Sequence, residues 1–157
     1  MRHLALIRHG EAVDSSPKGD HKRPLTSKGR DVVARLGSLL VSRGHEWDLI
    51  IHSDAVRAVG TTEILRSSFS GIECHKFASL YLAGFDQLLS EVAQFDQTRS
   101  ILAVGHNPGW SDIAMTLTGS AIGLATGDCA LMSIPQDEGW VECLGATGAW
   151  QLEHVRA

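Results

Sequence analysis

The chain has 157 residues, of which 43% are hydrophobic and 20% are charged, and its formal net charge is −4. This composition excludes a disordered or fibrous protein, and the length predicts one domain over residues 1–157. The acidic balance and the lack of a Lys/Arg run argue against a nucleic acid or a membrane surface as a partner.

The first predicted elements are a strand, a long loop and a helix. Leu4 to Ile7 is a short apolar run typical of a buried strand, and it ends at Arg8-His9-Gly10. Residues 11–25 are rich in turn-forming residues and predict a surface loop. From Thr26, a good N-cap, apolar residues recur at helical spacing until Gly44, which predicts the first helix.

The middle of the chain alternates apolar runs with helical patterns. The predicted elements are, in order, a strand at 48–52, a helix from Ser53-Asp54 to about Phe69, a strand at 72–75, a helix over 85–95, a strand at 101–104, and a helix with Asn107 as N-cap and Pro108 in the first turn. Strands that alternate with helices in this way are typical of a mainly parallel sheet.

After Gly119 the pattern changes to short strands. We expect strands at 130–134 and 139–144, joined by a turn at 136–138, and an edge strand at 150–153. The predicted fold is therefore a single α/β domain with a mainly parallel sheet, helices on both faces and an antiparallel edge near the C-terminus.

The ends of the parallel strands carry two arginines and two histidines. In an open α/β sheet, ligands bind where the carboxyl ends of strands lead into helix N-termini. Three such ends are Arg8-His9-Gly10, the segment from Ser53 to Arg57, and Gly105-His106-Asn107. The guanidinium fork of arginine matches phosphate oxygens, and a neutral histidine ring can act as a nucleophile. The pattern therefore indicates a phosphate site.

These residues resemble the histidine phosphatase superfamily, whose signature is an Arg-His-Gly triplet at the end of the first strand, here Arg8-His9-Gly10. Three further segments resemble those of the family: RPLTSKG at 23–29, SDAVRAVGTTEIL at 53–65 and AVGHNPGW at 103–110. The resemblance extends from residue 4 to about 134. The short form without inserted subdomains looks most like the SixA-type phosphohistidine phosphatases, which have a phosphoglycerate mutase-like fold.

The resemblance implies a metal-independent phosphatase that needs no cofactor. His9 would be phosphorylated transiently, while Arg8, Arg57 and His106 would bind the phosphoryl oxygens. The partner would be a protein that carries phosphohistidine, or a small phosphorylated substrate. Two alternatives remain open: a small-molecule phosphomonoesterase of the same fold, and a catalytically silent adaptor that only binds phosphate.

The chain departs from the family pattern at three places. Asp54 stands where proline is usual, and we expect it to alter only the start of the helix. Ser15 stands where the mutase branch has an asparagine, which argues against that branch. Residues 79–83 read SLYLA and lack the catalytic carboxylate of the mutase and acid-phosphatase branches. Glu11 and Asp86 are the nearest candidates for a general acid, but we expect both to be solvated and leave them outside the site.

The remaining polar residues point to structural or peripheral roles. A basic cluster of Lys18, His21, Lys22 and Arg23 would either steer an anionic substrate or form a charged flexible loop. None of the other histidines has a partner at metal-ligand spacing; they are His3, His45, His52, His75 and His154.

The cysteines and the apolar runs indicate the compartment. Cys74, Cys129 and Cys143 form no CxxC pair, so we expect reduced thiols, mostly in the core. The apolar run before Arg8 is too short for a signal peptide, and no stretch approaches a membrane span. We therefore expect a cytoplasmic monomer.

Overall fold

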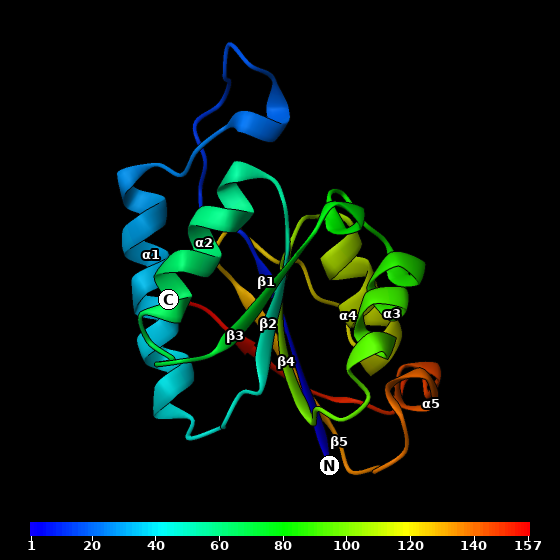
Figure 1. Cartoon of the computed structure of the whole chain (residues 1–157). Coiled ribbons are helices and arrows are strands. Elements are labelled where there is room, and N and C mark those ends of the chain that lie inside the picture. The colour runs from blue at the N-terminus through cyan, green and yellow to red at the C-terminus, as the bar shows by residue number, and fades with distance from the viewer.

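A six-stranded mixed sheet forms the centre of the computed structural model, which describes residues 1–157 (Figure 1). The strand order is β3-β2-β4-β1-β5-β6. The strands are β1 (Arg2–Arg8), β2 (Leu49–Ser53), β3 (Glu73–Phe77), β4 (Ser100–Gly105), β5 (Cys129–Ile134) and β6 (Gln151–Val155). The first four strands pair in parallel, and β5 and β6 add an antiparallel edge. The predicted fold class is confirmed.

Helices cover both faces of this sheet. On one face lie α1 (Ser27–Ser42) and α2 (Val56–Arg66), and on the other lie α3 (Phe85–Val92), α4 (Gly109–Thr118) and α5 (Trp140–Gly145) (Figure 1). Three short 3₁₀ helices complete the chain: η1 (Asp20–Lys22), η2 (Ala78–Leu80) and η3 (Ala93–Phe95). No helix is both long and apolar enough to cross a membrane.

Alternating residues of the central strands fill two separate cores. Leu4 and Leu6 of β1 belong to the core beneath α3, α4 and α5, whereas Ala5 and Ile7 belong to the core beneath α1 and α2. A strand covered on both faces needs apolar side chains at every position, which explains the continuous apolar run in β1. Both cores therefore hold the strand ends rigidly in place.

The cysteine expectation agrees with this packing. Cys129 and Cys143 are buried, Cys74 is half-buried, and all three are free thiols. Burial raises the pKa of each thiol, most strongly that of Cys129, and this favours the protonated form.

The prediction of a strand at 139–144 is wrong, because this segment forms α5. Trp140, Cys143 and Leu144 lie at helical spacing and are all buried in the core that contains α3 and α4. The first turn is held by the Asp96 carboxylate, which accepts a hydrogen bond from the Trp140 backbone N–H at 2.7 Å. A cap that comes from 44 residues earlier in the chain leaves no local sequence signal.

Several boundaries also differ from the prediction. The helix expected to have Asn107 as N-cap begins at Gly109 with Pro108 as N-cap. The third strand runs from Glu73 to Phe77, because it pairs with β2 along its whole length. The second helix begins at Val56, and Ser53 is the last residue of β2. The Ser53 hydroxyl oxygen accepts a hydrogen bond from the Ala55 backbone N–H at 3.1 Å, which forms a turn between strand and helix.

Candidate active site

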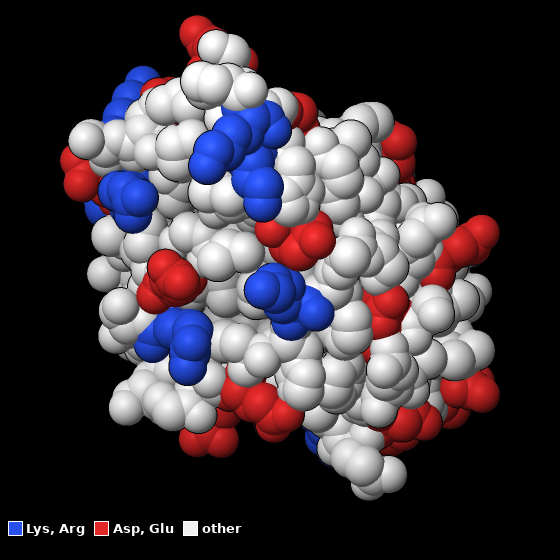
Figure 2. All heavy atoms as spheres, turned by 45° about the horizontal axis from the view of Figure 1, so that its top comes forward, with Lys and Arg blue, Asp and Glu red and all other residues white.

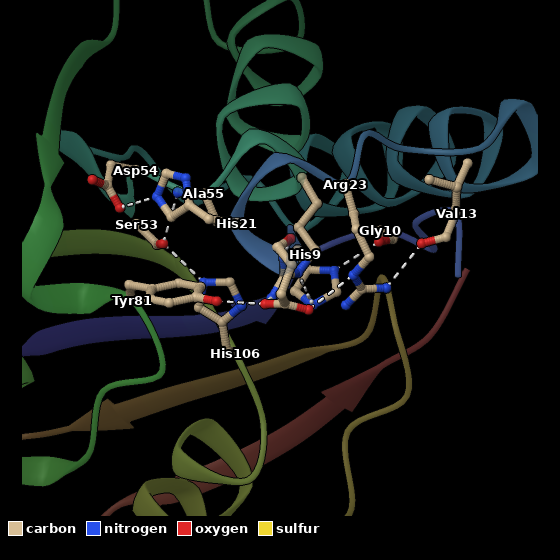
Figure 3. A network of polar contacts seen from close by, with 12 residues as sticks. His9, Gly10, Val13, His21, Arg23, Ser53, Asp54, Ala55, Tyr81 and His106 are labelled. Carbon is tan, nitrogen blue, oxygen red and sulfur yellow. Dashed lines mark hydrogen bonds and ion pairs between the residues drawn. The ribbon is translucent and has the colours of Figure 1, made fainter. Parts of the chain in front are cut away.

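The parallel strands bring the two predicted histidines together at one edge of the sheet. In the β1–β4 pairing Arg8 lies opposite Gly105, so His9 and His106 follow side by side. The two imidazole centroids are 5.2 Å apart. Figure 3 shows His9, Tyr81 and His106 turned toward the same space. The register of the sheet, rather than any local motif, sets this distance.

His9 is held in one tautomer. Its Nδ1 lies 2.7 Å from the Gly10 carbonyl oxygen, which can only accept a hydrogen bond, so Nδ1 carries the ring proton. Nε2 therefore presents a lone pair, and Arg57 Nε donates to it at 3.2 Å. The ring is only 6% exposed. Burial, with smaller contributions from Arg57 and Arg8, lowers the pKa of His9 to about 4. At neutral pH His9 is a neutral potential nucleophile.

Two arginines lie close enough to His9 to lower the pKa of its ring. Arg57 is buried in the first turn of α2, and its Nη1 and Nη2 donate to the backbone oxygen and the carboxylate of Asp20 at 2.9 and 3.1 Å. Arg8 donates through Nη1 to the Leu124 carbonyl oxygen at 2.9 Å, while its buried Nε has no partner. This N–H group is therefore available to donate to an anion.

His106 also leaves a polar atom without a partner. Its Nε2 lies 2.8 Å from the Ser53 hydroxyl oxygen, and its buried Nδ1 has no hydrogen-bond partner. Burial lowers the pKa of His106 to about 3, and His9 and Arg57 lower it further by smaller amounts. His106 is thus neutral in the free protein, and any contact with an anion must be made by an N–H of the neutral ring.

The four predicted site residues Arg8, His9, Arg57 and His106 line one cavity of about 370 Å³. The other lining residues are Glu11, Ala12, Asp20, Arg23, Leu82, Asn107 and Thr126. The residues that line the cavity include three arginines and the potential nucleophile His9. Two of their buried nitrogen atoms, Arg8 Nε and His106 Nδ1, have no hydrogen-bond partner. This donor set fits a phosphoryl group, whose oxygens need several donors at once. Nowhere do three His, Cys, Asp or Glu side chains converge in a way that could hold a metal ion.

Sequence reasoning missed Asp20 as a site residue, treating it only as a turn former in the loop. Its Oδ1 accepts from Arg23 Nε at 2.9 Å, and its Oδ2 accepts from Arg57 and from the Tyr81 hydroxyl. The hydrogen bond from Tyr81 is the largest of the interactions that lower the pKa of Asp20 to about 2, and Arg57 and Arg23 lower it further. Asp20 is therefore a fixed negative charge. Only its spacing of three residues from Arg23 hinted at this pairing.

The two carboxylates considered as general acids lie in different surroundings. The expectation that Glu11 lies outside the site is wrong, because Glu11 lines the cavity, where its carboxylate accepts from the Thr26 hydroxyl at 3.0 Å. Asp86 is exposed in the first turn of α3 and does not line the cavity. The segment at 79–83 contributes Leu82 to the cavity, but no carboxylate.

The basic cluster divides into two parts. Arg23 lies in the cavity, and His21 Nε2 lies 2.8 Å from the Asp54 carboxylate, whereas Lys18 and Lys22 are exposed. Asp54 therefore does more than alter the helix start, because it fastens η1 to the turn before α2. Figure 2 turns the upper end of Figure 1 forward and shows basic side chains in separate groups among acidic and uncharged ones. On this face the basic side chains therefore form no single continuous patch.

Comparison with known proteins gives concordant results. The family model "Histidine phosphatase superfamily (branch 1)" matches residues 4–81. An uncharacterized chloroplast protein of Arabidopsis thaliana is 31% identical over 99% of this chain and 78% of its own length. The mitochondrial serine/threonine-protein phosphatase PGAM5 of Rattus norvegicus is 40% identical over 72 residues, which are 45% of this chain and 24% of that protein.

Solved structures share the fold over nearly the whole chain. A protein from Nakamurella, assigned as the phosphohistidine phosphatase SixA, superposes with a TM-score of 0.80 at 26% identity and covers 97% of this chain and 93% of its own. The corresponding protein from Agrobacterium tumefaciens gives a TM-score of 0.83 at 24% identity, with 99% and 98% covered. The protein histidine phosphatase SixA with bound tungstate gives 0.81 at 17% identity, with 98% and 96% covered.

The buried histidines make stability depend on pH. The pKa of His106 is about 3 in the folded protein and about 6.5 in an unfolded chain, so the unfolded chain binds more protons as pH falls below 6.5. We expect the free energy of unfolding to fall between pH 7 and pH 5, and to fall by about 1–2 kcal/mol less in His106→Asn. Urea denaturation at both pH values measures this, with His75→Asn as control. An equal loss in parent and His106→Asn would contradict the depressed pKa.

Arg57 should not be replaceable by lysine. One ammonium group cannot contact both His9 Nε2 and Asp20, which the planar guanidinium does in the structure. We expect Arg57→Lys to weaken the binding of orthovanadate about 10–100-fold, as measured by calorimetry. Arg66→Lys, in the last turn of the same helix and exposed, should bind like the parent. Parent-like binding by Arg57→Lys would remove Arg57 from the anion site.

Proposed function

Because the chain belongs to the histidine phosphatase superfamily, we propose that this phosphatase hydrolyses phosphohistidine in proteins, through a phosphoryl intermediate on His9. We further propose that it works without a metal ion, in the cytoplasm and as a monomer. The observation that carries the proposal is the fixed tautomer of His9, whose Nε2 lone pair accepts a hydrogen bond from the buried Arg57.

The first step transfers the phosphoryl group to His9. The lone pair on Nε2 attacks phosphorus, the Nε2–P bond forms, and the bond from phosphorus to the leaving group breaks with its electron pair. Arg57 Nε, which donates to Nε2 in the free protein, can then donate to a phosphoryl oxygen. Arg8 Nε and His106 Nδ1 supply further donors, because both are unpartnered in the free protein. These contacts stabilise charge on the phosphoryl oxygens.

The second step restores the free protein. A water molecule attacks phosphorus opposite Nε2, the Nε2–P bond breaks, and its electron pair returns to the ring nitrogen as inorganic phosphate leaves. The bond from Nδ1 to the Gly10 carbonyl keeps the ring in place throughout. An adaptor that only binds phosphate would not need a free nucleophilic nitrogen, so this geometry favours the enzyme over the adaptor.

The charge state of Asp20 supports phosphohistidine as the substrate. An alkoxide leaving group needs a proton donor, which contributes typically 10²–10⁴-fold to its departure. The cavity contains the carboxylate of Asp20, but Tyr81, Arg57 and Arg23 hold it ionised, so it has no proton to give at neutral pH. An imidazole leaves more readily and can take its proton from solvent. The other carboxylate of the cavity, Glu11, accepts a hydrogen bond from the Thr26 hydroxyl and lies 4.0 Å from Lys28 Nζ. A cavity whose carboxylates are engaged in this way favours a good leaving group.

The first test asks whether a covalent phosphoryl intermediate forms on His9. We expect His9→Ala to lower turnover of phosphohistidine at least 10³-fold while the fold survives, because no other side chain presents a nucleophile at this point. Rapid acid-free quenching of the parent with labelled substrate, in the presence of a chelator, should trap acid-labile label on His9. A folded His9→Ala protein that retains more than a few per cent of activity would exclude His9 as the nucleophile.

The second test concerns the leaving group. We expect kcat/KM to fall steeply across substituted phenyl phosphates as the pKa of the leaving phenol rises, and phosphohistidine to react at least 100-fold faster than phosphoserine. The same series distinguishes a small-molecule phosphomonoesterase, which would prefer an alkyl or sugar phosphate. A flat dependence, or equal rates on phosphoserine and phosphohistidine, would show that a proton donor such as Glu11 acts after all.

A further inference from the structure

Ser53 connects the end of β2 to the second histidine of the site. Its side chain is fully buried, and its hydroxyl oxygen has two hydrogen-bond partners: the Ala55 backbone N–H at 3.1 Å and Nε2 of His106 at 2.8 Å. The Ala55 N–H can only donate, so it occupies one lone pair of the oxygen. The direction of the bond to His106 decides where the proton of that ring lies.

Two arrangements of this bond are possible, and they leave different groups unsatisfied. If Nε2 carried the proton and donated to Ser53, the buried hydroxyl hydrogen of Ser53 would have no acceptor. Nδ1 of His106 would then offer a bare lone pair, which repels phosphoryl oxygens. If Ser53 donates to Nε2, only the N–H at Nδ1 lacks a partner in the free protein. Buried hydroxyl groups almost always find an acceptor, which favours the second arrangement.

We infer that Ser53 is a positioning residue that donates its hydroxyl hydrogen to His106 Nε2 and so keeps the ring proton on Nδ1 as a donor to the phosphoryl group. Figure 3 shows the second ring nitrogen of His106 on the side turned toward His9. A neutral His106 can thus bind a phosphoryl oxygen without being protonated. This agrees with the low pKa of His106, which excludes an imidazolium at neutral pH.

The same logic applies to both histidines of the site. The Gly10 carbonyl fixes the proton of His9 on Nδ1 and frees Nε2 for attack, and the Ser53 hydroxyl fixes the proton of His106 on Nδ1 and so makes a donor. One neutral ring is set as a nucleophile and the other as a hydrogen-bond donor. The inference rests on the proposed function only where it predicts kinetics, because the tautomer itself can be observed without a substrate.

The direct test is the tautomer of His106 in the ¹⁵N-labelled parent protein. Long-range ¹H–¹⁵N correlation spectra at pH 7 distinguish protonated from unprotonated ring nitrogens, and the signals that disappear in His106→Asn identify the residue. We expect Nδ1 to be protonated and Nε2 unprotonated. A protonated Nε2 in the free protein would overturn the inference. This measurement needs no variant of Ser53, so it decides the matter even if such a variant fails to fold.

The functional consequence is tested with Ser53→Ala. We expect a loss of the single tautomer, about tenfold weaker binding of orthovanadate, and a similar fall in kcat/KM. Ser53→Thr, which keeps the hydroxyl, should recover most of the vanadate affinity. Ser100→Ala removes a buried strand hydroxyl at the opposite end of the sheet and should behave like the parent.

The outcomes separate this inference from the proposed function. Ser53→Ala with an unchanged tautomer and unchanged vanadate affinity would overturn the positioning role. A parent protein that binds vanadate and shows the expected tautomer, but does not hydrolyse phosphohistidine, would instead contradict the proposed substrate and leave the role of Ser53 supported.

Discussion

Removing water from His9 and His106 lowers the pKa of both rings, and the chemistry of the site depends on this effect. A protonated His9 would have no lone pair for attack, and two imidazolium rings with centroids 5.2 Å apart would repel each other and the nearby arginines. Burial avoids both problems, because it keeps the rings neutral well below physiological pH. Positive charge is left to the arginines, which cannot lose it.

Neutral histidines need fixed tautomers, and the surrounding main chain and side chains supply them. A carbonyl oxygen holds the proton of His9, and a serine hydroxyl lies against the far nitrogen of His106. Both partners are within the two strand ends or the turns that follow them, so they move with the sheet. The two cores on either side of β1 and β4 make that framework rigid.

The ionised carboxylate of Asp20 has two opposing effects in the cavity. It aligns Arg57 and Arg23 and receives the Tyr81 hydroxyl, which orders the guanidinium groups before substrate arrives. It also places a negative charge beside an anion site, which weakens phosphate binding. Three arginines line the cavity, so net positive charge remains even with Asp20 and Glu11 both ionised. Such a balance suits a substrate that must bind and a phosphate product that must leave.

The fold class and the four residues that meet at the sheet edge follow from the order of amino acids alone. Each apolar run predicts a strand, and the residues after three of these strands include Arg8, Arg57 and His106. Because these strands are parallel, their carboxyl ends lie at the same edge of the sheet. The tertiary structure alone decided the placement of Asp20, the pairing of Asp54 with His21, and the helix at Trp140–Gly145. Each of these rests on partners that are 33 to 44 residues apart in the chain. Local spacing predicts elements and strand ends, but contacts between distant segments depend on how the elements pack.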